Sequence, residues 1–199
     1  MSNVLFGIHF GSKLAGNTVI SLMKQNKIYF FDVDEDVDAD VFIYNAAKHF
    51  NPDVIFINAP LSIPGAFKDV CGCQDYEYRE ADKKVKSISP MIIGGITARA
   101  MRLKDKLEAE LSTKVYETNS KAQANNYELL AKGYKNKSLN LVTCRNHISE
   151  QLNNRLMFRC QDIKTWDHLD AMLSLVTAMR FISGQALPYG NTEEGLIYV

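Results

Sequence analysis

The stretch Asp53–Pro64, which reads Asp-Val-Ile-Phe-Ile-Asn-Ala-Pro-Leu-Ser-Ile-Pro, decides how the rest of the chain is expected to fold. Its segment Val54–Ile57 is a short run of β-branched and aromatic residues, typical of a strand buried on both faces between helices. Pro60 cannot donate to a sheet ladder, so the strand ends before it and leaves Asn58 at its carboxyl end. Because open α/β sheets bind ligands at such ends, we expect the functional site near Asn58.

Upstream of this strand, the sequence predicts three antiparallel strands and a helix. The strands are Val4–His9, Asn17–Lys24 and Ile28–Val33, joined by a turn of small residues and then by a polar hairpin turn. An acidic stretch leads into a helix over Ala39–Phe50, whose apolar positions fit a 3.6-residue period. The order up to Asn58 is therefore β-β-β-α-β.

Downstream of Asn58, the predicted elements are mostly helices, and two polar segments read as insertions after strands four and five. The predicted helices are Asp75–Lys86, Ile96–Leu111, Gln123–Ala131 and Trp166–Ser183, with a fifth strand at Lys114–Glu117. Leu139–Cys144 fits either a strand or a loop, and the tail after Gly184 is expected to be a loop. We expect one domain over residues 1–199.

Composition excludes some classes of protein. The chain has 199 residues, 46% hydrophobic, and 23 basic side chains balance 23 acidic ones. Total charge therefore implies no attraction to nucleic acid, although Arg79–Lys106 holds a local excess of bases. Four cysteines lack zinc-ribbon spacing and are expected to be free thiols. No apolar run is long enough for a membrane span and no signal peptide is evident, so a cytoplasmic protein is expected.

Several motifs together resemble a domain-of-unknown-function family of predicted nucleases with an RNase H-like fold, itself distantly similar to Holliday-junction-resolvase-type nucleases. The predicted strand and helix order is also that of the RNase H-like fold, a mixed sheet of three antiparallel and then parallel strands flanked by helices. The matching segments are Gly7-Ile8-His9, Asn58-Ala59-Pro60-Leu61, Arg79-x-x-Asp82, Glu117 after a strand, Asp167-x-x-Asp170-Ala171 and Glu194-Gly195-Leu196-Ile197.

Two departures from the family pattern concern the metal. The family typically has aspartate where this chain has His9 and Asn58. The resemblance implies a nuclease that holds divalent ions between carboxylates, with Asp170, Asp167, Glu117 and Asn58 as metal ligands and His9 as an altered catalytic residue. Mg²⁺ prefers anionic oxygen ligands, so the two replacements weaken the site for Mg²⁺, and Mn²⁺ is the other candidate cofactor.

The acids of the last helix also allow an interpretation without a metal. Asp167 and Asp170 are three residues apart and therefore lie on one side of the helix, where they converge. An acid in a first helical turn also favours the positive end of the helix dipole, and Glu117 fits a solvated strand end equally well. His9 fits either a core histidine bonded to backbone or a ligand.

Four residues are candidates for phosphate contacts. Ser12 and Lys13 lie in a glycine-flanked turn similar to the phosphate-binding hairpin of actin-like ATPases, although the glycines favour an ordinary hairpin turn over a phosphate site. Arg79 and Arg99, with the run Lys83-Lys84-x-Lys86, are candidates for contact with a phosphate backbone. Arg79 also has Asp82 one helical turn away as a possible partner.

The resemblance therefore supports two functions that the sequence leaves open. One is a metal-dependent nuclease that hydrolyses nucleic-acid phosphodiesters, with activity reduced by the replacements at His9 and Asn58. The alternative is a catalytically inactive homologue that binds a nucleotide, a nucleic acid or a protein.

Overall fold

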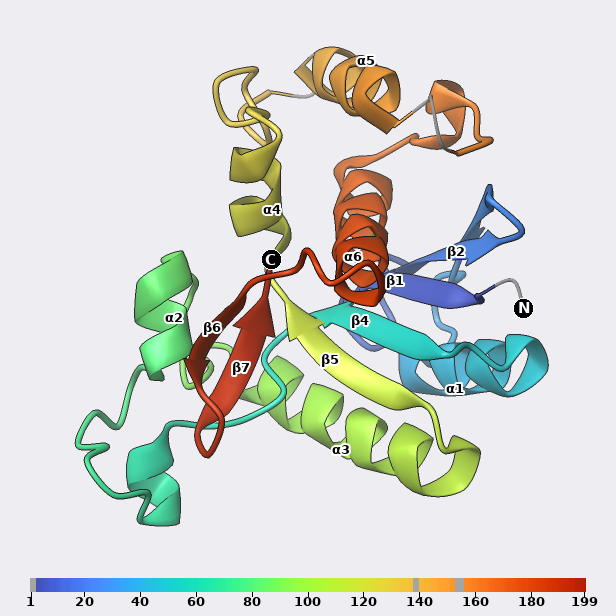
Figure 1. Ribbon diagram of the computed structural model, residues 1–199. Helices are drawn as coiled ribbons and strands as arrows, with labels where there is room; N and C mark the ends of the chain where they lie inside the picture. The colour runs from blue at the N-terminus through green and yellow to red at the C-terminus, as the bar shows by residue number, and fades with distance from the viewer. Residues whose placement is uncertain (1–2, 138–139, 153–155) are drawn as a thin grey trace.

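The computed structural model describes residues 3–137, 140–152 and 156–199, and Figure 1 shows a mixed sheet with helices on both faces. The strands lie in the order β3-β2-β1-β4-β5-β7-β6. They are β1 Leu5–His9, β2 Val19–Lys24, β3 Lys27–Asp32, β4 Val54–Asn58, β5 Lys114–Thr118, β6 Pro188–Asn191 and β7 Gly195–Tyr198. The helices are α1 Ala39–Phe50, α2 Glu80–Val85, α3 Gly94–Leu111, α4 Ser120–Asn126, α5 Asn140–Leu152 and α6 Trp166–Ile182, with 3₁₀ turns η1 Gly65–Lys68 and η2 Cys160–Asp162.

The central strands confirm the predicted fold class and strand directions. β1, β2 and β3 pair antiparallel, whereas β4 pairs parallel to both β1 and β5. The register places His9 opposite Asn58 and Ile57 opposite Glu117. The polar residues that end these strands therefore meet at one edge of the sheet, as predicted.

Helix α6 packs directly on one face of the sheet, while α1 and α3 cover the other (Figure 1). Every residue of α6 from His168 to Ala178 is buried, because α4, α5 and the segments that follow them cover its outer side. Close packing of α6 on β1 depends on Gly7, where an added Cβ would lie 2.0 Å from the backbone nitrogen of Leu175. The Ser21 hydroxyl donates to the carbonyl oxygen of Ala171 at 2.6 Å and fixes the same contact.

The predicted loop at the carboxyl-terminal end is wrong, because this segment forms strands β6 and β7. β7 pairs parallel to β5, with Glu117 opposite Ile197, and β6 pairs antiparallel to β7. Each strand has four residues, too short for an alternating pattern to stand out in the sequence. The Glu194 side chain ties the turn between them to the first insertion by accepting from the backbone nitrogens of Gly65 and Glu80.

Three helical boundaries also differ from prediction. Neither a strand nor a loop forms over Asn140–Cys144, which begins α5; Leu139 lies outside the described residues. Helix α2 starts at Glu80 rather than Asp75, because the Asp75 carboxylate accepts from two backbone nitrogens and holds a turn there. Helix α4 ends at Asn126, and turns replace the predicted helix through Ala131.

The structure also bears on the state of the cysteines and on membrane-spanning helices. All four cysteines are free thiols, as expected. Within the described parts of the chain, no helix is both long enough and apolar enough to pass through a bilayer.

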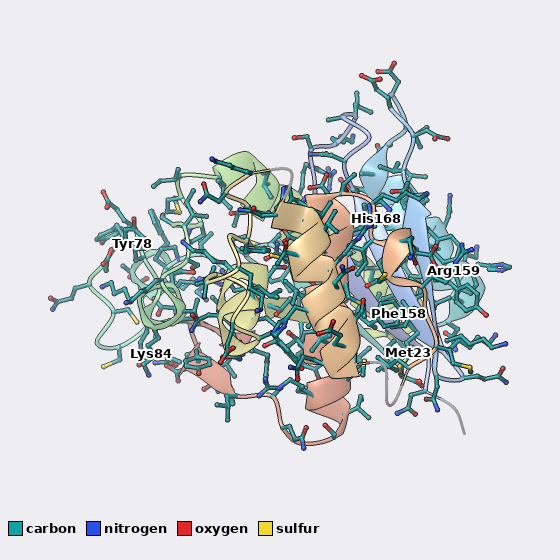
Figure 2. The ribbon with its side chains drawn as sticks, turned by 90° about the horizontal axis from the view of Figure 1, so that it is seen from above. Met23, Tyr78, Lys84, Phe158, Arg159 and His168 are labelled. Carbon is teal, nitrogen blue, oxygen red and sulfur yellow. The ribbon has the colours of Figure 1, made fainter. Side chains whose placement is uncertain are left out.

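Because His168 is buried, we expect the folded protein to lose stability in mild acid. Burial lowers its pKa below the ordinary value of 6.5, although its Nε2 lies 3.1 Å from Asp32. In Figure 2 it lies toward the same end of the molecule as Phe158 and Arg159, away from Tyr78. Because His168 binds a proton more readily in the unfolded state, its contribution to the free energy of unfolding is complete above pH 6.5. That contribution decreases as the pH falls toward the pKa of His168 in the folded protein.

Urea denaturation between pH 8 and 5 measures this effect, since His168→Gln removes the titrating group. We expect the free energy of unfolding of the wild type to fall more steeply over this range than that of the variant. Parallel curves for the two proteins would contradict the assignment to His168.

Candidate functional site

Three of the predicted site residues meet at the carboxyl end of β1. The imidazole of His9 lies between two carboxylates of α6: Nε2 is 3.2 Å from Asp167 Oδ1, and Nδ1 is 3.3 Å from Asp170 Oδ2. Thr165 caps α6 by accepting from the backbone nitrogen of His168, which fixes the first helical turn that carries both acids. The neighbours of His9 are thus side-chain carboxylates rather than the backbone groups considered from the sequence.

Asp170 is fully buried, and protein donors engage both of its oxygens. The Tyr134 hydroxyl donates to Oδ1, and Lys135 Nζ lies 2.5 Å from Oδ2. Burial alone would raise the pKa of Asp170, but the hydrogen bond from His9 and the charge of Lys135 hold it below its ordinary value. Burial, followed by the charge of Asp170, raises the pKa of Tyr134, so that hydroxyl keeps its proton. Asp170 is therefore an ionised carboxylate neutralised from within the protein.

Glu117 is held in a separate buried network centred on Arg79. Arg79 Nη2 and Nη1 donate to the two Glu117 oxygens at 2.6 and 2.7 Å, and Nε and Nη2 donate to Asp82 at 2.9 and 2.7 Å. Leu61 N also donates to Glu117 at 2.7 Å. Burial opposes the charge of Arg79, but its bonds to Glu117 and Asp82 raise its pKa. This network fastens the first insertion to β5.

The asparagine at the end of β4 also has a partner within the protein. Asn58 Oδ1 accepts from the backbone nitrogen of Ser120 at 3.1 Å. The adjacent Asn119 caps α4 by accepting from Ala122 at 2.8 Å. Asn58 therefore joins the end of β4 to the start of α4.

The other predicted phosphate contacts lie apart from this cluster. Lys13 Nζ pairs with Asp38 at 2.9 Å, and the Arg99 guanidinium pairs with Asp40 at 2.7 Å. The backbone nitrogen of Ser12 donates to an asparagine side chain within the same turn. Lys13 and Arg99 thus link the first hairpin to α1 and α3, whereas the Ser12 bond stays within its own turn. None of the three residues lines the cavity that opens beside Asp170. Their role as phosphate contacts stays a prediction.

A cavity of about 500 Å³ opens beside the buried Asp170. Its polar lining includes Lys86, Lys121, Lys135, Asn58 and Asn119, and its apolar lining includes Ile88 and Leu130. In the described parts of the chain, no carboxylate lies within ion-pair distance of Lys86 or Lys121.

Sequence reasoning proposed Lys86 as part of a basic track but missed the other two lysines and Tyr134. Lys121 and Lys135 lie in the polar tract of the second insertion, where a weak helical pattern gives no reason to select one lysine over another. The available signal was a basic, tyrosine-containing tract following a strand that ends at the site. That signal does not reveal which side chains line the cavity beside Asp170.

The predicted metal ligands do not fit a divalent cation in this arrangement. Hydrogen bonds from Arg79 occupy both Glu117 oxygens, and Lys135 places an ammonium group against Asp170. Mg²⁺ requires several oxygen ligands in near-octahedral geometry, and a cationic group beside them opposes its binding. Across residues 3–137, 140–152 and 156–199, no set of three or more His, Cys, Asp or Glu side chains is arranged to hold a metal ion.

Comparison of whole structures places this fold beside the Holliday junction resolvases. RuvC of Thermus thermophilus, solved in complex with a Holliday junction substrate, superposes with a TM-score of 0.51 at 13% identity, covering 92% of this chain and 97% of RuvC. The yeast mitochondrial Holliday junction resolvase Ydc2 superposes with a TM-score of 0.52 at 13% identity, covering 92% and 80% of the two chains. By sequence, no family model and no curated protein matches. The chain therefore shares the RNase H-like fold of these resolvases.

Proposed function

We propose that this protein binds nucleic acid in the cavity beside Asp170 and does not hydrolyse it by a two-metal mechanism. The observation that carries the proposal is that Lys86 and Lys121 line this cavity and have no carboxylate partner among the described residues. The cavity also presents the amides of Asn58 and Asn119. Ammonium and amide groups bind phosphate oxygens, and phosphate contacts supply most of the affinity of non-specific nucleic-acid binding. The fold likeness to RuvC, solved with a junction substrate, supports the same ligand class.

The charge balance of the site also favours binding over hydrolysis. In a two-metal nuclease, carboxylates hold the cations that stabilise the attacking and leaving oxygens. Here Lys135 neutralises Asp170, and Arg79 neutralises Glu117. The positive groups already belong to the protein, so a phosphate entering the cavity meets fixed cations.

One observation favours the second candidate function, metal-dependent hydrolysis. Asp167 and Asp170 lie on either side of His9, and the Asp167 side chain is 34% exposed. This pair forms part of a carboxylate site once Lys135 withdraws from Asp170. Nuclease activity in Mn²⁺ or Mg²⁺ that is lost in Asp170→Asn would support this function.

The proposed function is tested by anisotropy titration of fluorescently labelled DNA at several salt concentrations. We expect binding whose logarithm falls linearly with log salt, and Lys86→Gln and Lys121→Gln should each reduce that slope by about 1. Lys114→Gln is the matched control, because this exposed lysine lies at the amino end of β5, away from the cavity.

The titration, combined with a nicking assay in Mn²⁺, decides between the two candidate functions. Binding without nicking in Mn²⁺ supports the proposal. A salt slope unchanged by Lys86→Gln and Lys121→Gln would overturn the cavity as the phosphate site. Nicking that disappears in Asp170→Asn would replace the proposal with the nuclease function.

A further inference from the structure

A second cavity continues from the first, between α2, α4 and β6. Its volume is about 350 Å³, and it shares Lys86, Lys121 and Leu130 with the cavity beside Asp170. Figure 1 shows α2 and α4 on two sides of this region with β6 close by. The two cavities therefore form one groove, whose added part we call the α2–α4 groove.

The α2–α4 groove combines three kinds of surface. Lys84 and the two shared lysines supply positive charge, and Asn125 places an exposed amide at the end of α4. The neighbouring Asn126 donates its amide to Gln123 Oε1 at 3.1 Å. Val85, Leu130 and the aromatic ring of Tyr189 supply apolar surface. Lys84 pairs with Glu80 at 2.6 Å across one helical turn, but both side chains are about half exposed, so this pair is weak.

These surfaces suit a whole nucleotide, with its base, better than a phosphate group alone. An aromatic ring with apolar neighbours offers a stacking surface to a base, and asparagine amides hydrogen-bond to base edges. The volume lies within the range of small-molecule sites. Bases inside a duplex are stacked and paired, so a base enters such a pocket when it is unpaired.

We propose that the α2–α4 groove binds an unpaired base of single-stranded nucleic acid while the adjoining phosphate lies between Lys86 and Lys121. This inference rests on the proposed function and adds the class of ligand to it. The Tyr189 ring stacks on the base, the Asn125 amide contacts its edge, and the strand continues toward Asp170.

The test compares a short labelled oligothymidylate with a duplex of the same length, in wild type, Tyr189→Leu and Asn125→Ala. We expect the wild type to bind the single strand more tightly than the duplex. Tyr189→Leu should lose about fivefold or more of its single-strand affinity, the effect of removing one stacked base. Asn125→Ala should also weaken single-strand binding, by the loss of one hydrogen bond to the base edge. Because Asn125 is exposed, thermal melting of Asn125→Ala should match the wild type, so its loss of affinity does not reflect unfolding.

The outcomes separate this inference from the proposed function. Single-strand affinity that falls in Lys86→Gln and Lys121→Gln but not in the groove variants would overturn the base site and leave the phosphate site standing. Tighter binding of duplex than of single strand would also overturn the base site. Absence of binding to either nucleic acid would overturn the proposed function itself. Lys114→Gln again serves as the unchanged control.

Discussion

Arg79→Met should destabilise the protein by about 3–5 kcal/mol, because it leaves two buried carboxylates without their cation. Arg79 is fully buried and bonds to both Asp82 and Glu117. Methionine preserves much of the side-chain volume, so the loss reflects unpaired charge more than a cavity. Urea denaturation at pH 7 gives the difference in the free energy of unfolding.

The matched control for this substitution is Arg159→Met. Arg159 makes an ion pair of the same i, i+3 spacing with Asp162, but its side chain is 82% exposed. Solvent screens such a pair, so its loss should leave the unfolding midpoint nearly unchanged. Equal effects of the two substitutions would contradict the buried network as a source of stability.

The pH dependence gives this prediction a second readout. Burial raises the pKa of Glu117 in the folded state even though Arg79 opposes this shift. Without Arg79 that pKa should rise further, so the folded variant binds a proton more readily than the unfolded chain. Its stability relative to the wild type should therefore recover as the pH falls through the raised pKa of Glu117. A difference that stays constant with pH would indicate lost packing instead.

Gly7→Ala should have a comparable effect, about 3 kcal/mol, through backbone contact rather than charge. The new Cβ would lie 2.0 Å from the Leu175 nitrogen and 2.5 Å from the Ala171 carbonyl oxygen, both main-chain atoms that cannot rotate away. Helix α6 must then move off β1. Since α6 carries Asp167 and Asp170 against His9, the same shift should weaken the nucleic-acid binding proposed above.

Gly95→Ala is the matched control for the glycine substitution. Gly95 lies in α3, and nothing lies within 4 Å of an added Cβ there. Alanine is the better helix former, so stability should be unchanged or slightly increased. Equal losses of stability in the two alanine variants would contradict the close approach of α6 to β1.

The fold was largely predictable because its central elements carry strong local signals. The β-branched and aromatic run at Val54–Ile57 is a buried strand, and the apolar period over Ala39–Phe50 is a helix with those same bounds. The strand ends also brought His9, Asn58 and the acids of α6 to one region, as expected. The strands β6 and β7 and the start of α5 were missed, because short strands and weakly amphipathic helices depend on neighbours distant in the chain.

The partners of the site residues were not predictable from local sequence. Glu117 and Asp170 both follow the family pattern, but pattern alone does not specify whether a carboxylate faces a metal or a protein cation. Arg79 lies 38 residues before Glu117, and Lys135 lies 35 residues before Asp170. Contacts over such separations depend on how the two insertions fold back over the sheet edge.

The sequence by itself determined the RNase H-like order of strands and helices and the edge of the sheet where polar residues gather. Periodicity and turn residues act over a few positions, so these features are encoded locally. The tertiary structure alone decided that Lys135 and Arg79 neutralise the carboxylates and that Lys86 and Lys121 face an open groove. Charge pairing and burial depend on distances through space, which is why the cationic character of the site emerges only in the folded chain.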